Sequence, residues 1–444
     1  MMPHARISRL EYAFAGLVLL MFAEAFLPRL LAPAPTDVSG VAPESDLLRM
    51  MWLPAYALIV AGLVLIWKDA WRALVRAPWL VALALLAIAS TIWSIDPELS
   101  FRRGVALLAT TFLGLYLAAR YDWLAALRLL GVVWLVLMAA SFLAGLVAPG
   151  FALMQETHVG AWSGGWSEKN ALGGHAARAA FLFAFLAWRD QPWRAWWLGG
   201  LAVAFALVLL SRSTTGLLGA ALGLGVLVSA WWMLKGRRWS LALGWSAAAA
   251  GIVVALAFAI APDAVLGAFG KDETLTGRTA IWAALSEAVA ERPVCGHGYM
   301  AYWGLDSEPR YWLSRALAWN VPSGHNGWID LAISLGAVGV AVFAIDLMLT
   351  LWRAGRQARL SPVGVFAVGF LAQFLLFAMS ESVLAAQNSI LWATYVFVGA
   401  KLALRQRRQS MTPLSTAPSV GAARTAPSAT ASVASSSISA VGAP

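Results

Sequence analysis

The sequence is poor in charged residues. Asp, Glu, Lys and Arg make up 12% of the 444 residues, whereas 61% are hydrophobic. An ordinary soluble domain has about 25% charged residues, so the composition excludes that class and predicts an all-α integral membrane protein. The formal net charge is +10, but the basic residues lie in short stretches between apolar segments, as membrane topology requires. Nucleic-acid binding is excluded on that ground.

Cysteine is nearly absent, and no metal site is evident. Cys295 is the one cysteine, so the chain has no internal disulfide. The spacing of the histidines, Cys295 and the carboxylates is not typical of a metal site. Asp306 and Glu308 form an acidic pair that would suit a divalent ion, but such pairs in exposed loops are usually only solvated. We therefore expect neither a metal nor a cofactor.

Long apolar runs dominate the rest of the chain. A hydrocarbon core about 30 Å thick needs roughly 20 apolar residues per helix. We expect the first run to be a retained helix, because it contains Glu24 and lacks a small-residue cleavage site. About twelve transmembrane helices are predicted, near residues 11–31, 50–67, 78–93, 104–119, 124–148, 170–188, 194–210, 214–234, 240–261, 326–352, 363–380 and 388–404.

Basic residues indicate the orientation of these spans. With the N-terminus in the cytoplasm, 19 of the 32 Lys and Arg residues fall on the inner, short connections. Both termini are then cytoplasmic, and residues 262–325 form a long periplasmic loop. Residues 1–410 are predicted to be one membrane-embedded catalytic domain. Residues 411–444 are rich in Ser, Ala, Thr and Pro and contain no aromatic residue, which predicts a disordered cytoplasmic tail.

The long outer loop contains one clear helical pattern. In residues 278–292, Ile281, Trp282 and Leu285 recur at helical spacing, whereas Glu287 and Glu291 fall on the other side. We expect an amphipathic helix that covers the membrane-embedded bundle.

Two arginines at the outer boundary are candidates for binding an anion. Arg212 lies in SRSTTG, among small hydrogen-bonding residues that open a helix, and Arg278 begins the predicted loop helix. A guanidinium beside a helix N-terminus suits a phosphate group. Arg212 is equally well explained as a snorkelling interfacial residue, and Arg278 as a solvated loop charge.

His325, in SGHNGW, is a candidate general base. It precedes the span that begins near residue 326, and a helix N-terminus disfavours the imidazolium form. A neutral imidazole is able to accept a proton. Asp330 lies on a different side of the same helix, so if His325 has an orienting partner, that partner comes from elsewhere.

The sixth predicted span also carries polar residues. Arg178 lies within it, and an intramembrane arginine is either functional or paired with a carboxylate such as Glu24. Residues 164–170 lead into this span and end in Lys169 and Asn170. We expect a structured turn that brings these two residues to the substrate.

Several of these residues form motifs that resemble those of a known family. His325-Asn326, nine intervening residues and Gly336-x-x-Gly339 are similar to the signature of bacterial O-antigen ligases. Arg212-x-x-x-Gly216 and the Gly277-Arg278 segment with Trp282 resemble the arginine elements of the wider O-antigen ligase and polymerase superfamily. The resemblance covers roughly residues 10–405.

The resemblance implies a GT-C-type glycosyltransferase of the bacterial inner membrane that works on its periplasmic face. Such enzymes transfer a glycan from undecaprenyl diphosphate to a sugar hydroxyl of lipid A-core. His325, Arg278 and Arg212 would then be catalytic, and Asn326, Arg178, Lys169 and Asn170 would bind substrate. Two guanidiniums can stabilise the leaving diphosphate without a metal, and direct displacement would invert the anomeric carbon.

Three alternatives remain open. An O-antigen polymerase or a protein O-oligosaccharyltransferase would share the donor and differ in the acceptor. A lipid or glycan transporter would belong to a different class, but it would be expected to show paired half-sequences and functional charges near the midplane. The sequence contains no such repeat, and its candidate charges lie near one face.

The predicted topology is testable by labelling. In a chain with Cys295 replaced by Ser, cysteines introduced between residues 262 and 325 should react with a membrane-impermeant thiol reagent in whole cells. Cysteines introduced into residues 235–239 should be protected. The reverse pattern would overturn the orientation.

Overall fold

The computed structural model describes residues 8–31, 50–155, 158–233 and 278–404. These residues form helices and loops with no strand; an isolated bridge joins Leu153 and Trp162. The main helices are α1 (Arg9–Met21), α2 (Leu27–Leu31), α4 (Trp52–Leu65), α5 (Trp67–Arg76), α6 (Pro78–Ala89), α7 (Pro97–Arg120), α8 (Trp123–Val147), α9 (Pro149–Ala152), α10 (Lys169–Arg189), α11 (Arg194–Leu210), α12 (Thr214–Met233), α15 (Arg278–Glu291), α16 (Glu308–Ala316), α17 (Gly327–Ala358), α18 (Pro362–Ala378) and α19 (Ile390–Ala403).

The all-helical, membrane-spanning character predicted from the sequence is confirmed, whereas the count of twelve spans is not. Six of the described helices are long and apolar enough to cross a membrane, and there are seven such spans if α4 and α5, bent by 99°, count as one. The predicted span at 11–31 is broken, because α1 ends at Met21 and the chain turns before α2. The span predicted at 240–261 and the tail at 411–444 lie outside the described residues.

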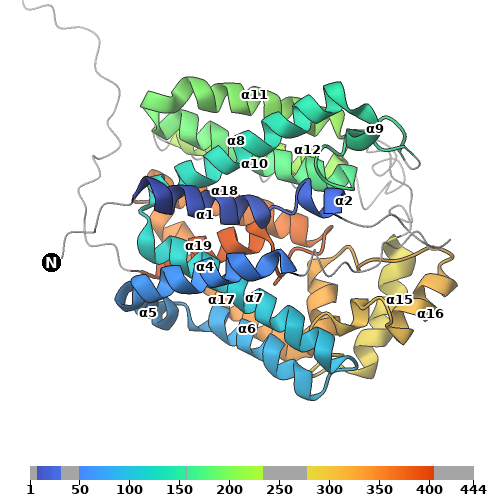
Figure 1. Ribbon diagram of the computed structural model, residues 1–444. Coiled ribbons are helices and arrows are strands. Elements are labelled where there is room, and N and C mark those ends of the chain that lie inside the picture. Colours follow the sequence, from blue (N-terminus) through green and yellow to red (C-terminus); the bar gives the residue numbers. More distant parts are fainter. Residues whose placement is uncertain (1–7, 32–49, 156–157, 234–277, 405–444) are drawn as a thin grey trace, which may run out of the picture. The chain divides into compact units, whose positions relative to one another are not determined.

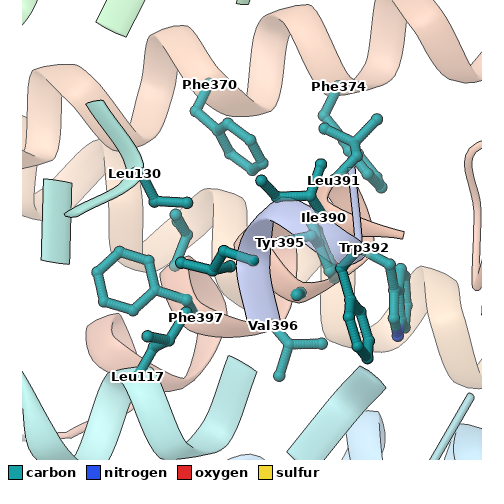
Figure 2. Packing of buried hydrophobic residues seen from close by; sticks show 14 of the residues in the cluster. Leu117, Leu130, Phe370, Phe374, Ile390, Leu391, Trp392, Tyr395, Val396 and Phe397 are labelled. Atoms are coloured by element: carbon teal, nitrogen blue, oxygen red, sulfur yellow. The ribbon is translucent and has the colours of Figure 1, made fainter. Parts of the chain in front are cut away.

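The core explains why some apolar helices are short. In α19, every side chain from Ile390 to Ala400 is buried, as expected for a helix that is apolar on all sides. A helix enclosed by protein does not need the length that the lipid core demands. Figure 2 shows this packing, in which α19 contributes Trp392, Tyr395 and Phe397 and its neighbours contribute Leu117, Leu130, Phe370 and Phe374.

The helices pack in two groups that share α18. The first consists of α10, α11 and α12, with α8 against α10 and α11. The second contains α6, α7, α17 and α19. Helix α18 packs against both α12 and α17, and the two groups can be followed in Figure 1. The loop after α18 is therefore positioned beside residues of both groups.

The amphipathic helix predicted in the outer loop is present as α15. Its buried side chains are Ile281, Leu285 and Ala288, and Trp282 is partly buried against them. They join a separate small core with residues of the following loop, of α16 and of α17: Tyr302, Trp303, Leu313, Val321 and Ile333. The described part of the outer loop is thus folded against α17.

The apolar run predicted as one straight span at 326–352 is interrupted at Gly336. This glycine has φ +63° and ψ −163° inside α17, a conformation that is essentially restricted to glycine. The interruption frees backbone groups that bind the outer loop: His297 N donates to Ile333 O, and Ala337 N donates to Pro293 O, both over 2.8 Å. A Cβ on Gly336 would lie 2.2 Å from Val294 O.

Replacing Gly336 with Ala should therefore destabilise the protein by at least about 2 kcal/mol, through backbone strain and the clash with Val294. Gly355→Ala is the matched control in the same helix, because a Cβ there meets nothing within 4 Å and Ala favours a helix. Thermal unfolding of the purified variants in detergent measures both effects. Equal melting temperatures for the two variants would contradict the role of Gly336.

Candidate functional site

His325 sits in a tightly held turn before α17. Its backbone has φ +47°, and the preceding Gly324 is fixed on both sides: its N–H donates to Asp330 Oδ1 and its carbonyl accepts from Trp282 Nε1, each over 2.9 Å. The Asn326 side chain caps α17 by accepting from Trp328 N and Ile329 N. These bonds hold the imidazole at the helix start, where 27% of the side chain is exposed.

The carboxylate beside His325 is Glu381, in the loop between α18 and α19. His325 Nδ1 lies 3.8 Å from Glu381 Oε2. This is longer than a hydrogen bond and is an ion-pair distance if His325 is protonated. Glu381 is therefore the carboxylate available to orient His325 from outside α17. Sequence reasoning did not identify it, although it is the lone acidic residue between positions 362 and 404.

Arg278 meets the same loop from α15. Its Nη1 donates to Ser380 O over 2.6 Å, and its Nη2 lies 3.3 Å from Glu381 Oε1. The side chain is 16% exposed. The predicted pair Arg278 and His325, which are 47 positions apart in the sequence, is thus brought together on one carboxylate.

Arg178 approaches this group from α10. Its guanidinium lies over the Phe377 ring, 4.4 Å from the centroid, and its Nη2 is 3.3 Å from His175 Nδ1. Within the described structure Arg178 forms no ion pair, so the pairing with Glu24 that the sequence allowed is not formed. Glu381 is the acidic residue that interacts electrostatically with Arg178.

Arg212, Lys169 and Asn170 form a second group. Lys169 Nζ donates to Arg212 O over 3.3 Å, and Ser213 Oγ contacts Asn170 Oδ1 at 3.0 Å. Gly216 of the Arg212 motif allows this approach, because a Cβ there would lie 2.8 Å from the backbone of Gly173 in α10. The Arg212 side chain is exposed and reaches Val159 O at 3.5 Å.

Glu168 connects the two groups. It immediately precedes α10 and interacts electrostatically with His325, Glu381 and Lys169. Desolvation raises the pKa of Glu168 above its ordinary value, and the like charge of Glu381 raises it further, against the opposing effects of His325 and Lys169. Residues from the start of α10, the start of α17 and the loop after α18 therefore interact electrostatically, and Arg278 of α15 joins them through Glu381. The exposed Arg212 side chain is not among the groups that act on Glu168.

The acidic pair Asp306 and Glu308 is not part of this site. Glu308 lies in the first turn of α16, where its Oε1 accepts from Trp312 Nε1 over 3.3 Å. Within the described part of the chain, no three His, Cys, Asp or Glu side chains are grouped closely enough to hold a metal ion.

Two comparisons show which known proteins this chain is similar to. Residues 199–344 match the family model described as O-antigen ligase. That segment includes Arg212, Arg278 and His325 and ends before Glu381. The chain is also 28% identical to the exopolysaccharide production protein ExoQ of Rhizobium meliloti (strain 1021) over 352 residues, which cover 76% of this chain and 79% of the relative.

The hydrogen bond from Trp282 to Gly324 provides a test of the His325 turn. Trp282→Phe keeps the ring but removes the N–H donor, so we expect a loss in turnover of about fivefold, the effect of one net hydrogen bond of about 1 kcal/mol. Trp312→Phe removes a comparable indole donor from exposed α16 and should leave turnover unchanged. Similar losses in both variants would argue against a specific role for Trp282.

Proposed function

Because the chain belongs to the O-antigen ligase superfamily, we propose that it is a glycosyltransferase that moves a glycan from undecaprenyl diphosphate to a sugar hydroxyl. The observation that carries the proposal is the meeting of His325 and Arg278 at Glu381. A histidine that can accept a proton and a cation then lie at the same carboxylate, which supports glycosyl transfer from a diphosphate.

In this reaction His325 is the general base. Its Nδ1 faces Glu381, so we assign the Nδ1 proton to that side, which leaves the Nε2 lone pair to accept the acceptor's hydroxyl proton. The hydroxyl oxygen then bonds to the anomeric carbon as the bond from that carbon to the diphosphate oxygen breaks. The leaving group departs as undecaprenyl diphosphate, and attack from the opposite face inverts the anomeric carbon.

The cationic residues bind the donor. Arg278 and Arg212 stabilise the charge that develops on the leaving diphosphate, a role that needs no divalent metal. Lys169 and Asn170 contribute from the start of α10. Asn326 contributes through its amide nitrogen, since its oxygen caps α17. Arg178 contributes indirectly, through its electrostatic interaction with Glu381.

The first candidate acceptor is lipid A-core. The description of the family model as O-antigen ligase supports it. In that case the protein is a GT-C-type enzyme of the bacterial inner membrane, with its active site on the periplasmic face and both termini in the cytoplasm. It then completes lipopolysaccharide.

A second candidate acceptor is the end of another lipid-linked glycan, which would make the enzyme a polymerase. The relative that covers 76% of this chain is described as an exopolysaccharide production protein, and this supports a polymer-forming reaction. Catalytic chemistry at His325 and Arg278 is the same for both acceptors.

A strain that lacks the protein distinguishes the two acceptors. Loss of a ligase leaves lipid A-core without attached glycan while polymerised, lipid-linked glycan accumulates. Loss of a polymerase leaves single lipid-linked repeat units and no long polymer. A strain in which neither the long glycans nor their lipid-linked precursors change would contradict the proposed function.

His325→Ala should abolish transfer without abolishing donor binding. Loss of a general base typically lowers the rate by about a hundred- to ten-thousand-fold. Activity of the purified protein, assayed in excess chelator, and binding of undecaprenyl diphosphate measure the two effects separately. Near wild-type transfer, or parallel loss of binding and activity, would show that His325 has another role.

Arg212→Lys and Arg278→Lys should each lower turnover by about tenfold or more although the charge is kept. The planar guanidinium offers paired donors that an ammonium group lacks. Arg356→Lys is the control, because Arg356 lies near the far end of α17 over the exposed Trp352 ring. Normal turnover in both test variants would remove these arginines from the diphosphate site.

A further inference from the structure

Glu381 is held loosely on its exposed side. Its two oxygens lie 3.3 Å from Arg278 Nη2 and 3.8 Å from His325 Nδ1, whereas charge-assisted contacts are usually 2.7–2.9 Å. A quarter of the side chain is exposed. The carboxylate therefore neutralises Arg278 without being locked onto it.

Arg178, which is buried in α10, interacts electrostatically with the same carboxylate, although the two side chains form no ion pair within the described structure. Its relative exposure is 9%, and its Nε and Nη1 make no hydrogen bond within the described structure. The Phe377 ring beneath this guanidinium and the Phe377 carbonyl, which accepts from Glu381 N over 2.7 Å, belong to the same residue. Arg178 therefore lies against the residue whose carbonyl anchors Glu381, and a buried guanidinium with unpaired donors is strongly stabilised by an anion.

The Arg278 guanidinium cannot bind the Glu381 carboxylate and a diphosphate equally strongly at the same time. Both are anions, and two like charges on one guanidinium repel each other. If Arg278 binds the donor diphosphate, as the proposed function requires, the contact from Nη2 to Glu381 has to open. The contact from Nη1 to the Ser380 carbonyl carries no net charge and can stay.

We propose that Glu381 occupies Arg278 in place of the donor diphosphate, and that Arg178 receives the displaced carboxylate when the donor binds. This inference rests on the proposed function. Glu381 and Arg178 are then positioning residues that act through Arg278. After the exchange, the buried Arg178 guanidinium is paired with the Glu381 carboxylate, which stays near His325. The Arg278 guanidinium is then free to bind the donor diphosphate.

The exchange predicts a specific coupling between two substitutions. Arg178→Met removes the cation that receives Glu381, so the carboxylate keeps competing for Arg278 and donor binding should weaken about tenfold. Glu381→Gln removes the competing charge, so donor binding should equal or exceed that of the wild type. In the double variant there is no carboxylate left to displace, and the penalty of Arg178→Met should disappear.

The experiment measures binding of undecaprenyl diphosphate, without glycan, to the purified full-length chain in detergent. The four proteins of the cycle are the wild type, R178M, E381Q and R178M/E381Q. Arg178→Lys keeps the buried charge and should bind within about threefold of the wild type. Arg178→Gln, which retains polar donors, replaces Arg178→Met if the latter fails to fold, and the same rescue is expected.

Arg310→Met provides a matched control for the loss of a buried arginine. Arg310 is 7% exposed, but its guanidinium is fully engaged with Val321 O, Gly304 O and Asn320 Oδ1. Its loss should lower the melting temperature, and E381Q should not rescue it. Rescue of R178M by E381Q, without rescue of R310M, supports the exchange.

Two results would overturn the inference in distinguishable ways. Additive effects of R178M and E381Q, or unchanged binding in R178M, would exclude the exchange while leaving the proposed function intact. Failure of the wild type to bind undecaprenyl diphosphate would overturn the exchange together with the donor assignment on which it rests.

Discussion

The candidate site depends on the contact between the outer loop and the interruption of α17 at Gly336. An uninterrupted helix would use its carbonyl and N–H groups internally and would have none to offer the loop. The bonds from His297 to Ile333 and from Ala337 to Pro293 fix the end of α15 against α17. With α15 in place, Arg278 reaches the loop after α18 and Trp282 reaches Gly324. Gly336 therefore affects the candidate site indirectly, because it fixes the position of the segment that carries Arg278 and Trp282.

The sequence was most informative where hydrophobic periodicity or a helix boundary decided the structure. The face of α15 that carries Ile281 and Leu285, and the placement of His325 before α17, were both predicted correctly. The number of twelve spans is not confirmed, because several apolar helices of the described residues are shorter than a lipid-exposed span needs to be. In α19 the surrounding helices replace the lipid, so apolar character alone does not define a span. Gly336 was read only as a motif residue because the run around it is continuously apolar.

Only part of the candidate site was accessible from the sequence. His325, Arg278 and Arg212 lie in recognisable local patterns, whereas Glu381 stands in a loop of small and apolar residues without any pattern of its own. Its significance depends on helix packing, because α18 connects the group that contains Arg178 with the group that contains His325. For the same reason, the sequence offered Glu24 only as one example of a carboxylate that could pair with Arg178. Which carboxylate faces a buried arginine is a property of the packed bundle.

The position of α19 has a consequence for biosynthesis. A chain is made from its N-terminus, so α7, α17 and α18 are present before the helix that fills the space among them. Until α19 arrives, Thr111 lacks the Trp392 indole that donates to it and Asp346 lacks the Tyr395 hydroxyl. The loop that carries Glu381 is anchored at both ends only when α19 is in place. The candidate site is therefore completed only when α19, the last helix among the described residues, is in place. A nascent chain that already contains His325 and Arg278 still lacks that completed site.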